Sequence, residues 1–319
     1  MIAVTPIRLA SGGVTVIGVV TRFVAGQVTA YDCSGEPAAV AVFPVEPPIE
    51  PKGHAVAPDL RRAVYTTDDD MVCVDRDGNT VWRLAFGTRA EQRYVAAASC
   101  AFSPDGALVW LYRPDVMARR GDGPDQWVAV DAVTGDVVAT AELDCVGQGG
   151  TQFAHPDGVH MLLDVGEGQD GSRVYRGHLH HDVIDLSAYP WTDRLLVGLA
   201  PDGRHFMTVH HNQEDVTFHT YPDGDVVLWI PVESFGYEPD EAYVEWTGGY
   251  LDARTAIVVI GGETEDEREW YLRHLVDVRT GQVLGTLDAQ SRDVYDVQPL
   301  GDGSWLSTDD NNRIRRHTR

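Results

Sequence analysis

A Pro-Asp turn that returns at nearly constant spacing is the feature of this sequence that most limits its possible folds. Its prolines are Pro58, Pro104, Pro156 and Pro201, which are 46, 52 and 45 positions apart. Because proline presets φ at the first corner of a β-turn and the glycine that follows in three copies tolerates the later corner, each copy predicts a tight hairpin. Weaker copies of the turn lie at Leu251-Asp252-Ala253 and Leu300-Gly301-Asp302-Gly303.

A second turn recurs further along each repeat. Asp131–Gly135 and Asp277–Gly281 both read Asp-x-x-Thr-Gly, and the β-prone runs Trp127–Val130 and Val137–Thr140 flank the first of them. Each such turn therefore predicts a second hairpin, and two hairpins give four antiparallel strands. No segment has a 3.6-residue apolar period with helix caps, so we expect few helices.

The repeats divide the chain into seven units, which we predict to form one domain over residues 1–319. In the last unit only three strands are evident, Val294–Pro299, Ser304–Thr308 and Arg313–His317. We predict that Ile2–Thr5 supplies its fourth strand and thereby closes the fold, because an unpaired edge strand exposes a row of hydrogen-bonding groups. The predicted units are residues 5–45, 54–86, 96–143, 151–188, 194–233, 243–288 and 293–318.

With these two turns in each unit, the chain resembles the WD40 and YVTN-type β-propeller superfamily over almost its whole length. The resemblance implies an all-β fold, a single seven-bladed β-propeller of four-stranded antiparallel blades. No unit carries the Gly-His pair or the terminal Trp-Asp of a well-formed WD40 repeat, so the chain is a divergent relative. Propellers include scaffolds, ligand binders and enzymes, so the resemblance implies a fold and no single function.

The charge balance limits the partners of the protein. It has 49 Asp and Glu against 25 Lys and Arg, a formal net charge of −24. Such an excess of negative charge repels phosphate backbones and anionic lipids, which argues against nucleic acid and membrane partners. The absence of a long apolar run and of a leader pattern at the start predicts a cytoplasmic protein. Its four cysteines are far apart and predict reduced, buried thiols.

Acidic residues are concentrated in the predicted loops between the second and third strands of the units. These loops hold 18 acids in 51 residues, against 31 acids in the other 268. A propeller would bring the loops to one face, where the shared negative field would attract cations or basic ligands. The alternative is that these loops are only solvated. The acidic residues that we predict to bind a ligand are Asp68, Asp69, Asp70, Glu265, Asp266, Asp309 and Asp310.

Aromatic residues near the connections between units are a second candidate for ligand contact. Trp191, Tyr237 and Trp246 lie close to the predicted first strands of the fifth and sixth units. On a face that a ligand can reach they would supply stacking or cation–π contacts beside the acids. Packing between blades explains the same aromatics equally well.

Histidines form two clusters that could carry metal or proton-transfer chemistry. His178 and His180 alternate along a predicted strand with Asp182 nearby, which is the pattern of a transition-metal site. His210, His211 and Glu214 lie in a second–third strand loop and are the candidate acid–base groups. The two clusters fall at opposite ends of their units, so they are not expected to combine, and ordinary surface histidines remain the alternative.

Two hypotheses for function follow. The leading one is a noncatalytic binding or interaction module whose acidic loop face holds a cationic small molecule or a basic peptide or protein partner, with no cofactor. The alternative is a small-molecule enzyme, a lyase or hydrolase, with its site on the same face and a divalent cation or the His210 cluster as its catalytic groups. No G-x-S-x-G elbow, H-E-x-x-H or P-loop is present in the sequence.

Overall fold

Short antiparallel β-sheets make up nearly all of the regular structure. The computed structural model describes residues 3–7, 17–86, 96–115, 124–264, 266–289, 291 and 293–319. Within these ranges there are seven sheets, and the only helices are two short 3₁₀ turns, η1 (Gly168–Asp170) and η2 (Val232–Phe235). In every sheet the strands follow one another in chain order. The predicted all-β fold of seven repeated antiparallel sheets is confirmed.

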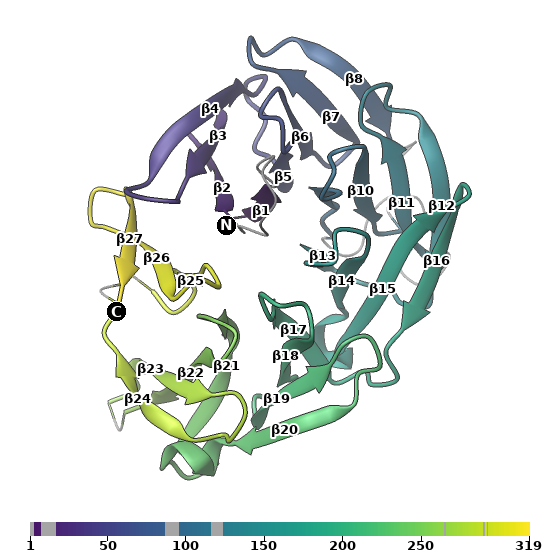
Figure 1. The fold of residues 1–319 in the computed structure, drawn as a ribbon. Coiled ribbons are helices and arrows are strands. Elements are labelled where there is room, and N and C mark those ends of the chain that lie inside the picture. Colours follow the sequence, from purple (N-terminus) through teal and green to yellow (C-terminus); the bar gives the residue numbers. More distant parts are fainter. Residues whose placement is uncertain are drawn as a thin grey trace. The chain divides into compact units, whose positions relative to one another are not determined.

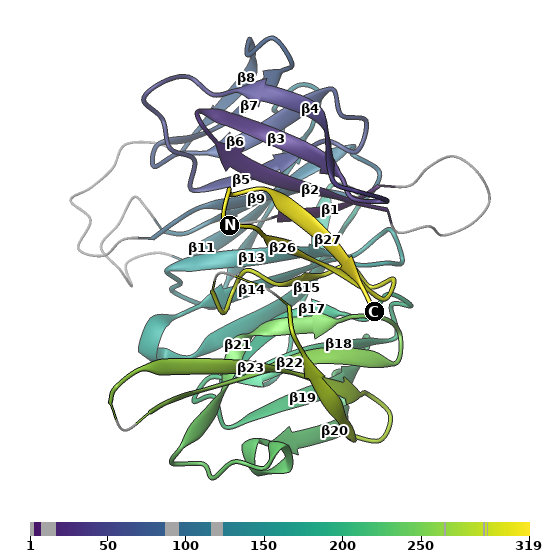
Figure 2. The ribbon, with the colours of Figure 1, turned by 90° about the vertical axis from the view of Figure 1, so that its left-hand side faces the viewer.

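The contacts within the chain divide it into two compact units, residues 1–190 and 191–319, which are described separately below. The first unit contains four four-stranded sheets (Figures 1 and 2). Their strands are β1 (Ala3–Ile7), β2 (Ile17–Val24), β3 (Gln27–Asp32) and β4 (Ala38–Pro44); β5 (Gly53–Val56), β6 (Arg62–Thr66), β7 (Asp70–Asp75) and β8 (Thr80–Ala85); β9 (Ser99–Phe102), β10 (Leu108–Arg113), β11 (Asp125–Asp131) and β12 (Val137–Leu143); and β13 (Gly149–Ala154), β14 (Met161–Gly166), β15 (Ser172–His180) and β16 (Val183–Ala188).

The second unit contains two four-stranded sheets and a sheet of three described strands. The strands are β17 (Arg194–Leu199), β18 (His205–His210), β19 (Asp215–Thr220) and β20 (Val226–Pro231); β21 (Ala242–Tyr250), β22 (Thr255–Glu263), β23 (Glu269–Asp277) and β24 (Val283–Leu287); and β25 (Gln298–Pro299), β26 (Ser304–Thr308) and β27 (Ile314–Thr318).

The apolar cores lie between consecutive sheets of a unit. In the first unit, one cluster joins Phe43 of β4 to Tyr65 of β6. In the second unit, Phe218 of β19 packs in one cluster with Ile260 of β22, and Ile257 packs with Trp305 of β26 in another. The middle strands are buried on both faces, which explains their continuous apolar runs, whereas the outer strands alternate in burial.

The repeated Pro-Asp-Gly turns have the local structure that the sequence predicts. In the turn between β9 and β10, the Asp105 carboxylate accepts the backbone N–H of Ala107 at 3.0 Å, and Gly106 has φ of 72°. In the turn between β17 and β18, Asp202 accepts the N–H of Arg204 in the same way. Asp tightens the turn through its own side chain, and only glycine enters the left-handed region without strain.

The prediction for the N-terminal strand is wrong. Residues Ala3–Ile7 pair antiparallel with Ile17–Val24, the next strand along the chain, and form the first strand of the first sheet. Residues 17–44 supply only three strands, so the first sheet itself needs this segment as its fourth. Pairing with a strand ten residues away also closes a much shorter loop than pairing with residues near 315. Ile2 lies outside the described residues.

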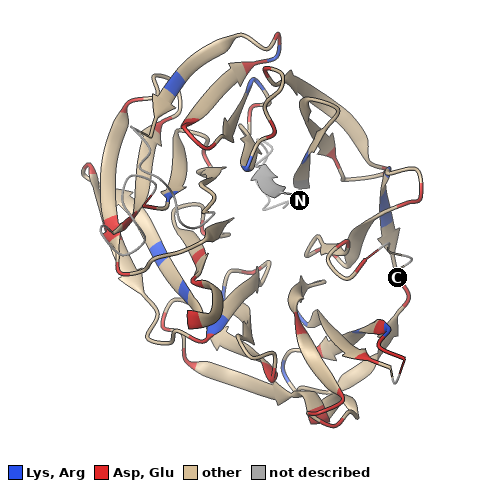
Figure 3. Cartoon of the chain, turned by 180° about the vertical axis from the view of Figure 1, so that it is seen from behind, with Lys and Arg blue, Asp and Glu red and all other residues tan. Residues whose placement is uncertain are grey.

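Figure 3 marks Asp and Glu residues at many of the turns and strand ends. No helix of the described residues is long and apolar enough to span a bilayer.

Candidate functional site

A bulge in β21 is the most irregular point in the sheets of the second unit. Val244 is paired with Ile260 of β22, and the next paired residue, Gly248, faces Val258. Glu245, Trp246 and Thr247 therefore stand opposite a single residue of β22. Gly248 has φ of 137°, and a Cβ there would lie 2.4 Å from the Ile257 carbonyl oxygen, so the bulge requires glycine at this position. β-Bulges redirect side chains, and they are common beside functional sites.

Glu245 is a buried residue whose carboxylate has no partner in the described part of the chain. Its residue is only 9% exposed, and its side chain has no hydrogen bond or ion pair with any of the described residues. Its Oε1 lies beside Gly261 of β22, 2.7 Å from the place where a Cβ would stand, and the ring of Tyr243 lies 2.9 Å from the same place. Gly261 thus leaves the space that the carboxylate occupies. Burial raises the pKa of Glu245, and the neighbouring charge of Glu269 raises it further.

Two more glutamates lie near Glu245. Glu263 at the end of β22 and Glu269 at the start of β23 are directly opposite each other in the hairpin register. Like charges in this position repel each other and destabilise a sheet. Neither carboxylate makes an ion pair with a described residue. Glu245, Glu263 and Glu269 together place three acids on one end of this sheet without a described basic partner.

Two tyrosines complete this group. Burial raises the pKa of Tyr243, and the charges of Glu245, Glu269 and Glu263 add to the increase. Tyr295, which is 57% exposed, has its pKa raised by burial of its hydroxyl and then by Glu245. Burial is the larger cause of both pKa shifts, and the nearby negative charge adds to it. The name acid–tyrosine cluster is used below for Tyr243, Glu245, Glu263, Glu269 and Tyr295.

The spacing of the cluster favours an extended cation over a bare metal ion. Among the described residues, no three His, Cys, Asp or Glu side chains are placed to hold one metal ion together. An ammonium or guanidinium group spreads its charge over several N–H or C–H donors and can contact separate carboxylates and aromatic faces at once. The cluster has the acids and aromatics for such a group.

The other side of the bulge carries Trp246, one of the predicted ligand-binding residues. The indole is 38% exposed, stacks on His211 with ring centres 5.9 Å apart, and donates from Nε1 to the His210 carbonyl oxygen at 3.4 Å. The structure thus brings Trp246 together with the predicted catalytic candidates, in one half-exposed surface beside the acid–tyrosine cluster.

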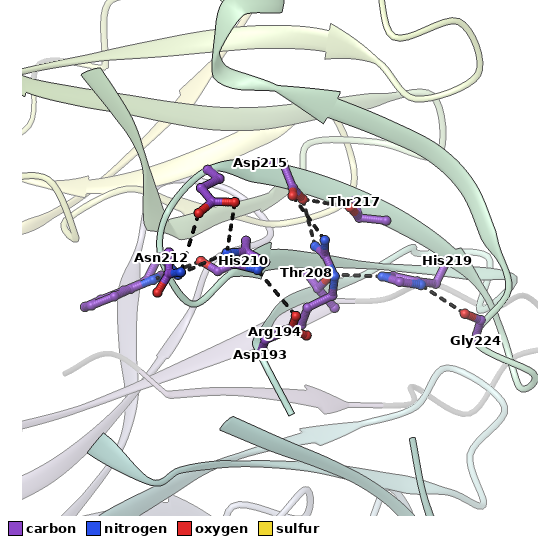
Figure 4. Close-up of polar contacts among 11 residues, drawn as sticks. Asp193, Arg194, Thr208, His210, Asn212, Asp215, Thr217, His219 and Gly224 are labelled. Atoms are coloured by element: carbon purple, nitrogen blue, oxygen red, sulfur yellow. Dashed lines mark hydrogen bonds and ion pairs between the residues drawn. The ribbon is translucent and has the colours of Figure 1, made fainter. Parts of the chain in front are cut away.

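His210 is fixed between two carboxylates (Figure 4). Its Nε2 lies 3.4 Å from Asp193 Oδ2, and its Nδ1 lies 3.9 Å from Glu214 Oε2. The backbone N–H of Asn212 donates to Nδ1 at 3.1 Å. Because Nδ1 accepts this hydrogen bond, the proton of the neutral ring resides on Nε2, facing Asp193. The arrangement secures the β18–β19 turn, and Nδ1 already has a donor.

The remaining polar contacts of this sheet lie deeper (Figure 4). Arg194 forms a two-point ion pair with Asp215, with N–O distances of 2.8 and 3.1 Å. Burial alone would raise the pKa of Asp215, but hydrogen bonds, chiefly from Arg194, outweigh burial and lower it. Thr208 pairs with His219 Nε2 at 2.9 Å, and both residues are buried. A substrate cannot reach these groups, so they support the fold.

The predicted acidic ligands are in varied surroundings. Asp70 is buried, where it accepts from Thr67 and pairs with Arg83. Asp309 pairs with Arg315 at 2.9 Å. Asp68, Asp69, Asp266 and Asp310 are exposed in their loops, and Glu265 lies outside the described residues. Because these loops belong to two separately described units, their convergence on one face stays a prediction.

The other predicted aromatic and metal-binding residues are also placed. Trp191 stacks on buried His219 at 4.7 Å, and Tyr237 packs against Trp270 at 5.3 Å, so both rings already have packing partners. His178 and His180 lie on β15 with ring centres 6.1 Å apart. Asp182 lies in the following turn with φ of 60°.

Sequence reasoning missed Glu245 and the pairing of Glu263 with Glu269. Glu245 stands between two aromatics, Tyr243 and Trp246, in a run that otherwise alternates like a strand. The Gly248-Gly249 pair just after it was the available signal, because adjacent glycines within a strand indicate a bulge.

Comparisons with known proteins identify the fold. No protein-family model matches the chain, and no curated protein matches it. Among solved structures, Kuenenia stuttgartiensis hydrazine synthase is 13% identical, with a TM-score of 0.60 over 95% of this chain and 92% of that one. The β-propeller domain of Myceliophteria thermophila Cps50 (Swd1) is 10% identical, with a TM-score of 0.56 over 93% and 94%. BamB from Moraxella catarrhalis is 10% identical, with a TM-score of 0.54 over 99% and 94%. At these identities the similarity shows the fold alone, and it confirms the predicted resemblance: the chain has the β-propeller fold.

Proposed function

We propose that this protein is a noncatalytic binding module that holds the ammonium or guanidinium group of a basic peptide or protein partner at the acid–tyrosine cluster. The observation that carries the proposal is Glu245, a residue only 9% exposed whose carboxylate has no partner among the described residues. A second pair of acids, Glu263 and Glu269, repel each other beside it.

The energetics favour binding of a cation at this cluster. Burial of Glu245 disfavours its charged form, and a directly opposed acid pair adds to that cost. A bound cation reduces both penalties. It supplies hydrogen-bond donors to Glu245, and its positive charge offsets the repulsion between Glu263 and Glu269. The rings of Tyr243 and Tyr295 would add cation–π contact of about 0.5–2 kcal/mol each.

Charge supports a basic partner. The net charge of −24 raises the association rate of positively charged molecules and disfavours nucleic acid and anionic membranes. The solved structures of similar fold carry names as different as a hydrazine synthase and BamB, so their roles do not decide the function of this chain.

The contacts of His210, the candidate acid–base group, favour a binding function over catalysis. His210 has its Nδ1 bonded to the Asn212 N–H and its Nε2 directed to Asp193, so neither ring nitrogen is directed to an open position for substrate. Glu214 is the exposed carboxylate beside it. A general base must reach the proton that it removes, and this geometry serves the turn instead.

The test measures the affinity of a fluorescently labelled lysine-rich peptide for the wild-type protein, for Glu245→Gln and for Glu214→Gln. Both substitutions remove one negative charge, but only the first removes the buried unpartnered carboxylate. We expect Glu245→Gln to weaken binding tenfold or more, because loss of one member of a desolvated charge pair costs at least about 1.4 kcal/mol. Glu214→Gln should change the affinity less than twofold, and salt should weaken wild-type binding.

A peptide with glutamine in place of every lysine serves as the ligand control. Binding that is equal for the lysine and glutamine peptides, or equal for Glu245→Gln and wild type, would overturn the proposal. Circular dichroism of each variant confirms that the sheets remain folded.

A further inference from the structure

A row of histidines crosses the last sheet of the first unit. In the β14–β15 register Met161 faces Gly177, so the adjacent residue His160 lies opposite His178. His178 is in turn paired with Asp185 of β16. The ring centres of His160 and His178 are 4.7 Å apart, and those of His178 and His180 are 6.1 Å apart. Three imidazoles from two neighbouring strands thus share one surface.

A carboxylate orients the His160 imidazole, and a second carboxylate lies near that of His178. His160 Nδ1 lies 2.7 Å from Asp157 Oδ2, and His178 Nδ1 lies 3.8 Å from Asp185 Oδ2. A carboxylate that accepts from Nδ1–H fixes the ring tautomer whose lone pair is on Nε2.

We propose that His160 and His178 form a surface site for a divalent transition-metal ion such as Zn²⁺, Ni²⁺ or Cu²⁺. Each imidazole would bind through Nε2, with Asp157 holding the His160 ring from behind and water completing the coordination. Two imidazoles on one tetrahedral ion have ring centres roughly 5 Å apart, because each metal–nitrogen bond is about 2.1 Å. The observed spacing of 4.7 Å fits this geometry. Imidazole ligands select these ions over Mg²⁺ and Ca²⁺.

The site differs from the one predicted from the sequence. His160 replaces Asp182 as the neighbour of His178, because the β14–β15 pairing brings together residues 18 positions apart. No group of three His, Cys, Asp or Glu in the described part of the chain has the spacing of a complete metal site. The proposed site accordingly uses two protein ligands, and the ring centre of His180 lies 6.1 Å from that of His178.

The experiment titrates purified protein with Zn²⁺ in competition with a chromophoric chelator. We compare wild type with His160→Ala, His178→Ala and a control, His205→Ala, which removes a single half-buried imidazole on β18. Each of the first two substitutions should weaken Zn²⁺ binding at least tenfold, and the control should change it less than twofold. Mg²⁺ should not compete with Zn²⁺.

A fourth variant, Asp157→Asn, tests the orienting carboxylate. Asn keeps the side-chain oxygen that accepts the N–H groups of Val159 and His160, so the turn remains intact. Loss of the charge behind His160 should weaken Zn²⁺ binding about tenfold. The proposal is wrong if the wild-type affinity persists in His160→Ala and His178→Ala, or if His205→Ala lowers it as much. A folded wild type that binds no Zn²⁺ also overturns it.

Discussion

Glu263 and Glu269 face each other directly across the β22–β23 hairpin. Opposite charges in this position would stabilise the pairing of the two strands. Beside them, Glu245 is buried in a bulge without a partner among the described residues. A chain selected only for stability would place a basic residue in such a group. We therefore interpret the acid–tyrosine cluster as a place where the protein retains local instability that a cationic ligand relieves.

Neutralising one member of the opposed pair should stabilise the free protein. Glu269→Gln is expected to raise the midpoint of thermal unfolding by roughly 1–2 °C at low salt, because it removes repulsion from Glu263 and from Glu245. The increase should shrink near 1 M salt, which screens charges beyond about 3 Å. Differential scanning fluorimetry at both salt concentrations makes the measurement. A lower midpoint for Glu269→Gln at low salt would contradict the repulsion.

Gly261→Ala should displace the Glu245 carboxylate. The new Cβ would lie 2.7 Å from Glu245 Oε1 and 2.9 Å from the Tyr243 ring, so at least one side chain must move. We expect the lysine-rich peptide to bind at least severalfold more weakly, with a loss of about 1–3 kcal/mol in stability. The matched control is Gly166→Ala at the end of β14, where a Cβ meets nothing within 4 Å. Equal peptide affinity in the two variants would show that this space is not part of the site.

Buried histidines should make the protein sensitive to acid. Burial lowers the pKa of His219 to about 4, and it also lowers the pKa of His274. In the unfolded chain His219 binds a proton below about pH 6.5, whereas in the folded chain it stays neutral down to about pH 4. The contribution of these histidines to the free energy of unfolding is therefore fully present above about pH 6.5, the pKa of an unfolded histidine, and it is lost as the pH falls from there towards about 4. His219 alone accounts for about 3 kcal/mol.

Urea unfolding at several pH values between neutral and about 4 measures this loss. The variant His219→Gln removes the titrating group, so its free energy of unfolding should depend less steeply on pH than that of wild type. Equal slopes for the two proteins would exclude His219 as a source of the acid sensitivity.

The ion pair of Arg194 and Asp215 should be costly to break. Arg194→Met leaves the buried Asp215 carboxylate without its two guanidinium donors, and we expect a loss of about 3–5 kcal/mol in the free energy of unfolding. The double variant Arg194→Met with Asp215→Leu removes both charges and should recover part of that loss. A double variant less stable than Arg194→Met would show that the two residues contribute through separate contacts.

Removal of residues 1–7 should damage the first sheet and leave the last sheet unchanged. The deletion takes away β1, so the amide groups of β2 that pair with it lose their partners. Hydrogen exchange should accelerate in Ile17–Val24, and β26 and β27 should keep their protection. Faster exchange in Ile314–Thr318 instead would show that the N-terminal segment pairs with the last sheet.

The sequence by itself determined the repeated architecture. Local chemistry predicts the turns at Pro58, Pro104, Pro156 and Pro201. Proline fixes φ, and the carboxylate of the following Asp accepts the backbone N–H two residues further along the chain. Such signals need only neighbouring residues, and so the number of sheets and the position of nearly every hairpin could be read before the structure. The same patterns placed Trp246 and His178 on strands and His211 in a loop, whereas His210 is the last residue of β18.

The tertiary structure decided which side chains meet. The bulge at Glu245 depends on how β21 fits against β22, and the facing of Glu263 with Glu269, or of His160 with His178, depends on a register that a single-residue shift would reverse. The N-terminal strand likewise had two possible partners that the sequence does not distinguish, the next strand Ile17–Val24 and an edge of the last sheet. Strand pairing and burial are properties of residues far apart along the chain, and for this reason the sequence specified the blades of this protein whereas only the fold assembled its candidate sites.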